Sequence, residues 1–273
     1  ITNASSKNAA IVSEGLTGGL IGYAQYNTII ANSTTQNLSA KASTVGGLIG
    51  KAIAYNGMII NSYTEGTVTL INNASTVNLG GLVGIIVGSD NASLFSTAKT
   101  AFKIYNSYSS MRIENKEITN PSKPIYVGGL IGSINSYIAL NNVYADNSLT
   151  NVFNSNPPGA IGGYASTSSV FYTEITNVYW HLDAVFNDAN GRISKENMRA
   201  FGSGQDTVIN DTTLGNKTTK LNNELFRADS SIENALVNQL NLGKPSVSNY
   251  PALSWSNQEG SSPYFSDSDT YKV

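Results

Sequence analysis

The sequence predicts an all-β protein folded as a parallel β-helix, or solenoid, that ends in a mixed helical and irregular C-terminal cap. Three observations predict this fold. A glycine-rich pentapeptide occurs five times, and each copy is followed by an Asn-x-Tyr segment or, after the first copy, by the variant Asn32-Ser-Thr34. Val, Ile, Thr and Tyr occupy alternating positions between these markers, and glycine recurs too often for a helix interior. A chain repeat of this kind predicts coils whose equivalent residues stack at about 4.8 Å.

The pentapeptide is Gly-Gly-Leu-Ile-Gly or a close variant of it. Copies begin at Gly18, Gly46, Gly80 and Gly128, and a decayed copy is assigned to Pro158-Gly-Ala-Ile-Gly162. The intervals are uneven, as in solenoids whose surface loops differ in length between conserved strands. The start, Ile1-Thr-Asn3, has the sequence of the tail of a sixth unit, so we expect the parent chain to continue at the N-terminus.

Stacking of the units predicts ladders of equivalent side chains. We expect an interior aliphatic column from the Leu of each pentapeptide, joined by the following Ile or Val if a bend turns both inward. The Asn residues are expected to form a turn ladder with hydrogen bonds from coil to coil. The aliphatic pairs are Leu20-Ile21, Leu48-Ile49, Leu82-Val83, Leu130-Ile131 and Ala160-Ile161, and the Asn residues are Asn32, Asn61, Asn106, Asn142 and Asn177.

The tyrosines of the Asn-x-Tyr segments predict a second ladder, which consists of Tyr63, Tyr108, Tyr144 and Tyr179. Positions that recur in every unit usually serve stacking, so the favoured interpretation of these tyrosines is structural.

The pentapeptides, the Asn-Ser-Tyr segments and the strand Glu65-Gly-Thr-Val68 together resemble the GLUG repeat of bacterial surface proteins. The resemblance implies a right-handed parallel β-helix. It also implies a place in large adhesins of the filamentous-haemagglutinin kind, or beside a metallopeptidase of the immunoglobulin-A-cleaving type. We therefore assign residues 1–180 to the β-helix repeats and 181–273 to a capping segment or small subdomain.

The C-terminal part carries helix signals and a terminating strand. Ser230 and Glu233 form a capping box before an apolar face, which predicts a helix from about 231 to 241, and Ser194 can cap a shorter helix. The segment Tyr250-Pro-Ala-Leu-Ser-Trp255 resembles the strand that closes such arrays.

Composition excludes several function classes. Only 12% of residues are charged and the net charge is -2, so the chain offers no electrostatic footprint for a nucleic acid. Apolar runs such as Leu79 to Gly88 are far shorter than the roughly 20 residues of a membrane span, so no membrane insertion is expected. The absence of cysteine suggests export, and we expect a secreted or bacterial cell-surface protein.

No catalytic constellation or cofactor site is recognisable in the sequence. The single histidine, His181, has Asp183 nearby but no second His or Cys with which to bind zinc. Acidic residues in the repeats do not recur at equivalent positions, as paired catalytic carboxylates would require. The glycine segments lack the Lys-Ser/Thr of a phosphate-binding loop. We therefore expect a protein without enzymatic activity, bound metal or cofactor.

The expected function is a binding or stalk segment of a bacterial adhesin, a virulence-type role in which loops recognise a host or bacterial cell-surface glycan or protein. Unique loops are better candidates for recognition than repeated positions, so we select Phe95 to Phe102 and Asn115 to Tyr126. The candidate ligand-binding residues are Phe95, Phe102, Tyr105 and Tyr126. Two alternatives stay open: an accessory region of a secreted metallopeptidase, and a β-helical polysaccharide-active enzyme.

Overall fold

The computed structural model describes residues 1–70, 76–88, 101–114, 124–150, 156–166, 174–181, 186–187, 199–204, 218–221, 253–255 and 263–265. These residues form strands and turns, with no helix among them. The strands are β1 (Ser5–Lys7), β2 (Ala10–Val12), β3 (Leu16–Gly18), β4 (Ile21–Ala24), β5 (Ile29–Ala31), β6 (Thr34–Ala42), β7 (Thr44–Gly46), β8 (Ile49–Ile53), β9 (Met58–Ile60), β10 (Tyr63–Leu70), β11 (Val77–Gly80), β12 (Val83–Val87), β13 (Phe102–Glu114), β14 (Ile125–Gly128), β15 (Ile131–Asn135), β16 (Ile138–Ala145), β17 (Ser148–Thr150), β18 (Gly159–Ala165), β19 (Glu174–His181), β20 (Phe186–Asn187), β21 (Arg199–Gly204), β22 (Thr218–Leu221), β23 (Leu253–Trp255) and β24 (Pro263–Phe265).

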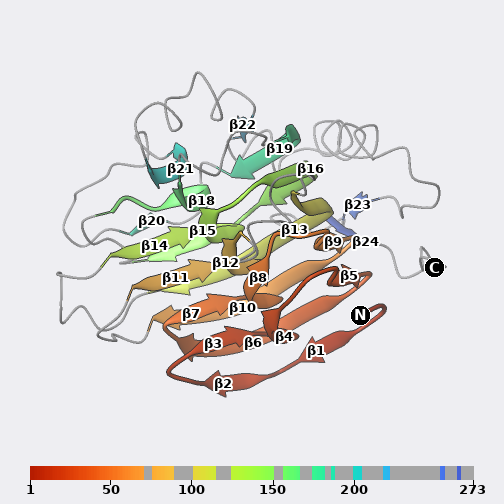
Figure 1. Cartoon of the computed structure of the whole chain (residues 1–273), viewed down its shortest axis with the longest axis horizontal. Coiled ribbons are helices and arrows are strands. Elements are labelled where there is room, and N and C mark those ends of the chain that lie inside the picture. The colour runs from red at the N-terminus through yellow and green to blue at the C-terminus, as the bar shows by residue number, and fades with distance from the viewer. Residues whose placement is uncertain are drawn as a thin grey trace.

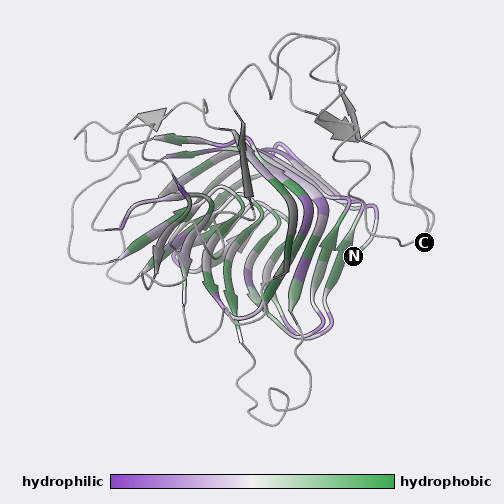
Figure 2. Ribbon diagram, turned by 90° about the horizontal axis from the view of Figure 1, so that it is seen from above, coloured by the Kyte–Doolittle hydropathy of each residue, from purple (hydrophilic) through white to green (hydrophobic). Residues whose placement is uncertain are grey.

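The strands build two long parallel sheets, as a parallel β-helix requires. Sheet A has 12 strands and follows the order β1-β6-β10-β13-β16-β19-β22, with the short strands beside this path. Sheet B has 10 strands, among them β3, β7, β11 and β14 in stacking order. Figure 1 shows the strands stacked one above another from the N-terminal end, and Figure 2 shows the successive coils in a view from above. The predicted parallel β-helix is confirmed.

Each glycine of the pentapeptide permits a different close approach, illustrated by the copy at residues 46–50. A Cβ on Gly46 would collide with the carbonyl of Ile49 inside the turn that joins β7 to β8. On Gly47 it would collide with the Gly81 carbonyl and lie 2.6 Å from Cγ2 of Thr64 in the opposite sheet. On Gly50 it would lie 2.8 Å from the backbone nitrogen of Thr17. The repeated glycines are therefore required by sterics.

The turn between β7 and β8 directs two consecutive aliphatic side chains inward. Leu48 and Ile49 are both fully buried, and so are Leu82 and Val83 in the next coil. Coil-to-coil backbone bonds hold them in line, with Leu48 N donating to Leu82 O at 2.9 Å. The predicted paired interior columns are confirmed for these coils.

The decayed fifth copy begins one residue later than the sequence suggested. Gly159 pairs with Gly128 and Gly162 pairs with Ile131, while Leu130 N donates to Ile161 O. Ile161 therefore continues the leucine column, and the placement of Ala160 in that column was wrong. An extra glycine, Gly163, follows the apparent pentapeptide and takes the place of its last glycine.

A polar column divides the interior opposite the second glycine of each pentapeptide. Its members are Thr35, Thr64, Ser109 and Asn147, all buried. The Thr64 hydroxyl donates to the Gly81 carbonyl at 2.7 Å, and its oxygen lies 3.0 Å from Ser109 Oγ, whose hydroxyl can donate to it. Larger side chains would not fit against the glycines here, so separate hydrophobic clusters fill the two sides of this column.

The predicted asparagine ladder is present and begins at Asn3, which confirms that Ile1-Thr-Asn3 has the tail position of a repeat unit. The residues Asn3, Asn32, Asn61, Asn106 and Asn142 all have positive φ, between 45° and 57°. Each later side-chain amide donates Nδ2 to Oδ1 of the preceding Asn, at 3.2, 3.1, 2.7 and 2.8 Å. Asparagine tolerates this left-handed conformation better than other residues with a Cβ. The side chain of Asn177 lies outside the described residues.

Parallel pairing continues past Trp180. Strand β21 pairs with β18, and β22 pairs with β19, so the stacking reaches beyond the last glycine pentapeptide. The helices expected near Ser194 and at 231–241 lie outside the described residues. Leu253–Trp255 forms a strand as expected, but its described partner is β24, to which it is antiparallel in a separate two-stranded sheet.

We expect the substitution Gly47→Ala to destabilise the solenoid by about 1 to 3 kcal/mol, the usual effect of overpacking a filled interior. The Cβ would collide with backbone of the next coil and with Thr64 of sheet A. Chemical denaturation followed by circular dichroism measures the change. Gly15→Ala is the matched control, because the nearest atom to its Cβ is Ser13 Oγ at 3.9 Å. Equal effects at the two sites would contradict the steric explanation.

We expect Asn61→Ala to lower stability by about 3 kcal/mol, because alanine is strained at positive φ and two ladder hydrogen bonds are lost. Asn61→Gly keeps the backbone conformation and loses only the hydrogen bonds, so it should cost about 1 to 2 kcal/mol. Thermal and urea unfolding of both variants separates the two contributions. An Ala variant as stable as the Gly variant would argue against backbone strain at this turn.

Candidate functional site

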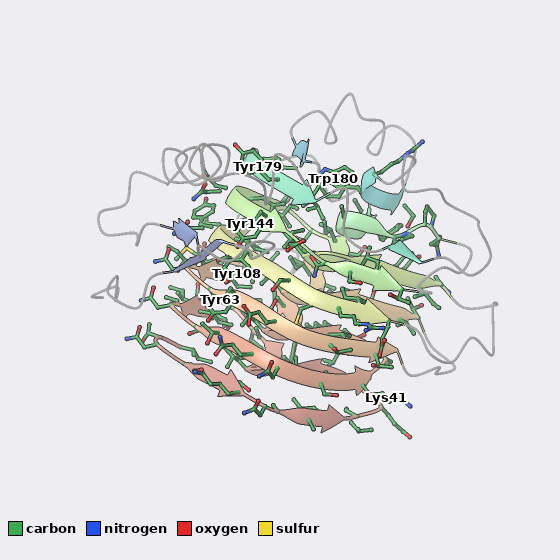
Figure 3. All side chains as sticks on the ribbon, turned by 180° about the vertical axis from the view of Figure 1, so that it is seen from behind. Lys41, Tyr63, Tyr108, Tyr144, Tyr179 and Trp180 are labelled. Carbon is green, nitrogen blue, oxygen red and sulfur yellow. The ribbon has the colours of Figure 1, made fainter. Side chains whose placement is uncertain are left out.

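The tyrosine ladder runs along sheet A. Tyr63 and Tyr108 stack with ring centroids 4.9 Å apart, and Tyr108 and Tyr144 stack at 4.6 Å. Tyr179 pairs in register with Tyr144, and the four residues follow one another up the stack in Figure 3. Tyr108 and Tyr144 are each only 1% exposed. The ladder serves stacking and presents little surface to a ligand, in agreement with the structural interpretation of these positions.

The lower end of the ladder is closed by polar groups. The position below Tyr63 is Thr34, which pairs with it in register. Gln36 Nε2 donates to the Tyr63 hydroxyl at 2.8 Å. The variant Asn-Ser-Thr unit thus ends the aromatic stack without leaving the Tyr63 hydroxyl unpaired.

Burial dominates the acid-base behaviour of the ladder. Desolvation raises the pKa of Tyr108 and of Tyr144 well above the ordinary tyrosine value, and the negative charge of Glu65 adds to both shifts. Asp146 raises the pKa of Tyr144 further. Desolvation also raises the pKa of Glu65 itself. Tyr108 and Tyr144 are therefore neutral, and they supply no phenolate for chemistry near neutral pH.

We expect alkaline pH to destabilise the protein through these tyrosines. A raised folded-state pKa means that the folded state holds the phenolic proton more tightly, so the stabilisation is complete below pH 10 and is lost as pH rises beyond 10. Unfolding midpoints measured between pH 8 and 11 should fall less steeply for the double variant Tyr108→Phe, Tyr144→Phe. A Tyr23→Phe variant is the control, since Tyr23 is 44% exposed. Identical pH profiles for the double variant and the parent would refute this account.

Of the four ligand-binding residues selected from sequence, the three that the structure describes do not form one site. Phe95 lies outside the described residues. Phe102 is fully buried in the main core cluster, where its ring occupies the space left by the absent side chain of Gly57. The selection of Phe102 as a surface contact was therefore wrong. Tyr105 is half-buried and packs on a small cluster with Ala31 and Ile60.

Tyr126 is the selected residue with the clearest surface arrangement. It lies half-buried on β14, and its ring centroid is 4.6 Å from that of Tyr164 on β18, with the rings tilted by 31°. The pKa of Tyr126 is raised by burial and by Tyr164. Two tyrosines from successive coils thus form one aromatic surface, which we call the tyrosine pair. Sequence reasoning missed Tyr164, because its register partner in β15 is Ser133, and the tyrosine at the equivalent position of the first coil, Tyr23, is separated from it by Lys51, Ile85 and Ser133.

Tyr164 belongs to a row of outward positions along sheet B, whereas Tyr126 on β14 pairs in register with Asn78 and lies outside this row. Register places Tyr23, Lys51, Ile85, Ser133 and Tyr164 one above another. At the N-terminal end of this row, Lys51 Nζ lies 5.3 Å from the ring centroid of Tyr23. Because the row changes chemistry at every coil, it can give different parts of the rod different binding properties.

The described residues contain no group of three His, Asp or Glu side chains that could hold a metal ion. The clearest charged contact joins Arg112 Nε to Glu114 Oε2 at 3.1 Å, and Thr69 donates to the same carboxylate at 3.3 Å. His181 ends β19, where its backbone pairs with Leu221, and its side chain lies outside the described residues. In the described part of the chain no helix is long and apolar enough to span a membrane.

Residues 41–69 match the family model of the GLUG motif. Thr69 pairs in register with Lys41, so the matched segment is one complete coil of the solenoid. The chain carries a GLUG motif. Neither the curated proteins nor the solved structures contain a match to this chain. The motif fits a repeat region of a surface or secreted protein.

Proposed function

We propose that this chain is a non-catalytic binding or stalk segment of a secreted or surface-displayed bacterial adhesin. The GLUG coil at 41–69 supports a repeat region, and a rigid stack of such coils holds surface groups at fixed separations. In this proposal the recurring side chains maintain the rod, and side chains that occur once make contact with the ligand.

The tyrosine pair carries the proposal for ligand contact. Tyr126 and Tyr164 keep part of their rings accessible while their backbones are fixed in adjacent strands. Tyrosines ordered in this way supply rigid, amphipathic contact area at a small entropic cost. Such a surface suits the apolar face of a sugar ring or an exposed side chain, so a cell-surface glycan or protein is the proposed ligand.

Binding to a glycan array and to extracts of host and bacterial cell surfaces tests the proposal. We expect Tyr126→Ala and Tyr164→Ala each to weaken capture about tenfold or more, as loss of an aromatic contact residue does. Tyr23→Ala is the matched control, because Tyr23 is an exposed tyrosine in the same outward row at the other end. Circular dichroism verifies that the variants fold. Capture by the parent that neither variant weakens would reject the tyrosine pair as the contact surface.

A further inference from the structure

The glycine turn brings two surface positions of sheet B together, one from the strand before the pentapeptide and one from the strand after it. A Cβ on Gly132 would lie 2.7 Å from the backbone nitrogen of Leu79 in the preceding coil. The residue after this glycine, Ser133, therefore has its backbone beside that of Asn78, the residue before Leu79. The tyrosine pair occupies the corresponding two positions one coil later.

The side-chain amide of Asn78 is buried and oriented. Asn78 is 6% exposed, and its Nδ2 donates to Oγ1 of Thr44, its register partner in the preceding coil, at 3.4 Å. Because the amide oxygen and nitrogen lie on opposite sides of the group, Oδ1 is turned toward the following coil, where the register partner is Tyr126. This buried Oδ1 has no hydrogen-bond partner in the described part of the chain. Such an acceptor is costly to leave unpaired.

The coil below the tyrosine pair is also polar after its glycine turn. Asn135 Nδ2 donates to Ser133 Oγ at 3.3 Å, and Asn135 is half-buried. The register partners of these two residues in the preceding coil are Ile85 and Val87. Hydroxyl and amide groups thus replace aliphatic side chains directly beneath the two tyrosines. These residues depart from the repeat at the same place as the tyrosine pair does.

We infer that these groups form one saccharide-binding surface, in which a pyranose ring lies against the tyrosine pair and its hydroxyls bond to the polar groups below. We call the set the saccharide surface: Asn78, Tyr126, Ser133, Asn135 and Tyr164. The inference rests on the proposed function and narrows its ligand from a glycan or protein to a glycan.

The chemistry of the surface favours a sugar over an apolar protein side chain. A pyranose has an apolar C–H face for the aromatic rings and a rim of hydroxyls that both donate and accept. One such hydroxyl, entering beside Tyr126, can donate to Oδ1 of Asn78. An apolar side chain on the same rings would leave that oxygen unpaired. All five side chains of the saccharide surface are uncharged, as suits recognition through a ring and its hydroxyls.

The test measures binding of the full chain to an array of oligosaccharides of glucose, galactose, mannose and N-acetylhexosamines, and then the Kd of the tightest one by calorimetry. Asn78→Val removes the amide and keeps the shape of the threonine at this position one coil earlier. Asn135→Val installs the residue found one coil earlier, Val87. Asn141→Val on sheet A is the matched control, because its register partner one coil later is also a threonine, Thr176.

We expect Asn78→Val and Asn135→Val each to weaken oligosaccharide binding about fivefold or more, the usual effect of losing one hydrogen bond. Asn141→Val should bind as the parent does. Circular dichroism and thermal unfolding verify that the three variants fold.

Three results would overturn the inference. Oligosaccharide binding that Tyr126→Ala weakens but Asn78→Val and Asn135→Val leave unchanged would keep the tyrosine pair as contact surface without the polar groups. Capture of a cell-surface protein that persists after its glycans are removed enzymatically, with no binding to the array, would retain the proposed function and reject the sugar. Absence of capture from both the array and the extracts would reject the proposed function as well.

Discussion

The stacking of coils at the spacing of hydrogen-bonded strands is the constraint on which the rest of this structure depends. Every side chain at a repeated position must fit directly above its counterpart. Glycine is needed where the next coil or the opposite sheet comes within contact distance, as at Gly47. Asparagine is favoured where φ is positive and the side chain can bond to its neighbours, as at Asn61. The residues that recur in the sequence are therefore the ones that the stacking of the coils requires.

The same constraint separates structural from functional positions. Tyr108 pairs in register with Tyr63 and Tyr144, and its ring stacks on theirs, so it leaves little surface for a ligand. Tyr164 has serine as its neighbour in the preceding strand, so its ring leans toward Tyr126 instead of joining a ladder. Side chains that break the repeat, as Tyr164 does, are therefore better candidates for contact with a partner than side chains that recur in a ladder.

Sequence reasoning predicted correctly the side-chain ladders at positions that recur from unit to unit. It failed at positions where a unit departs from the repeat. The asparagine and leucine ladders followed from periodicity, because identical residues at identical positions must stack. Phe102 looked like a loop residue after an insertion, and only the packing against Gly57 reveals that it fills the core. The fifth pentapeptide was misplaced by one residue, because Pro158-Gly159 imitates a glycine pair and Gly163 follows unnoticed. The tyrosine pair joins different coils, and spacing alone does not specify that contact.

Uniform ladder direction makes the rod chemically polar even though its net charge is small. In the described part of this ladder, Asn32, Asn61 and Asn106 each donate toward the N-terminal end and accept from the C-terminal side. Reversing one amide would place donor against donor on one side and acceptor against acceptor on the other, so the ladder keeps its direction as a unit. The backbone bonds of parallel strands are directional in the same sense. A solenoid of this kind therefore has two unlike ends, and growth of the stack adds coils in one orientation.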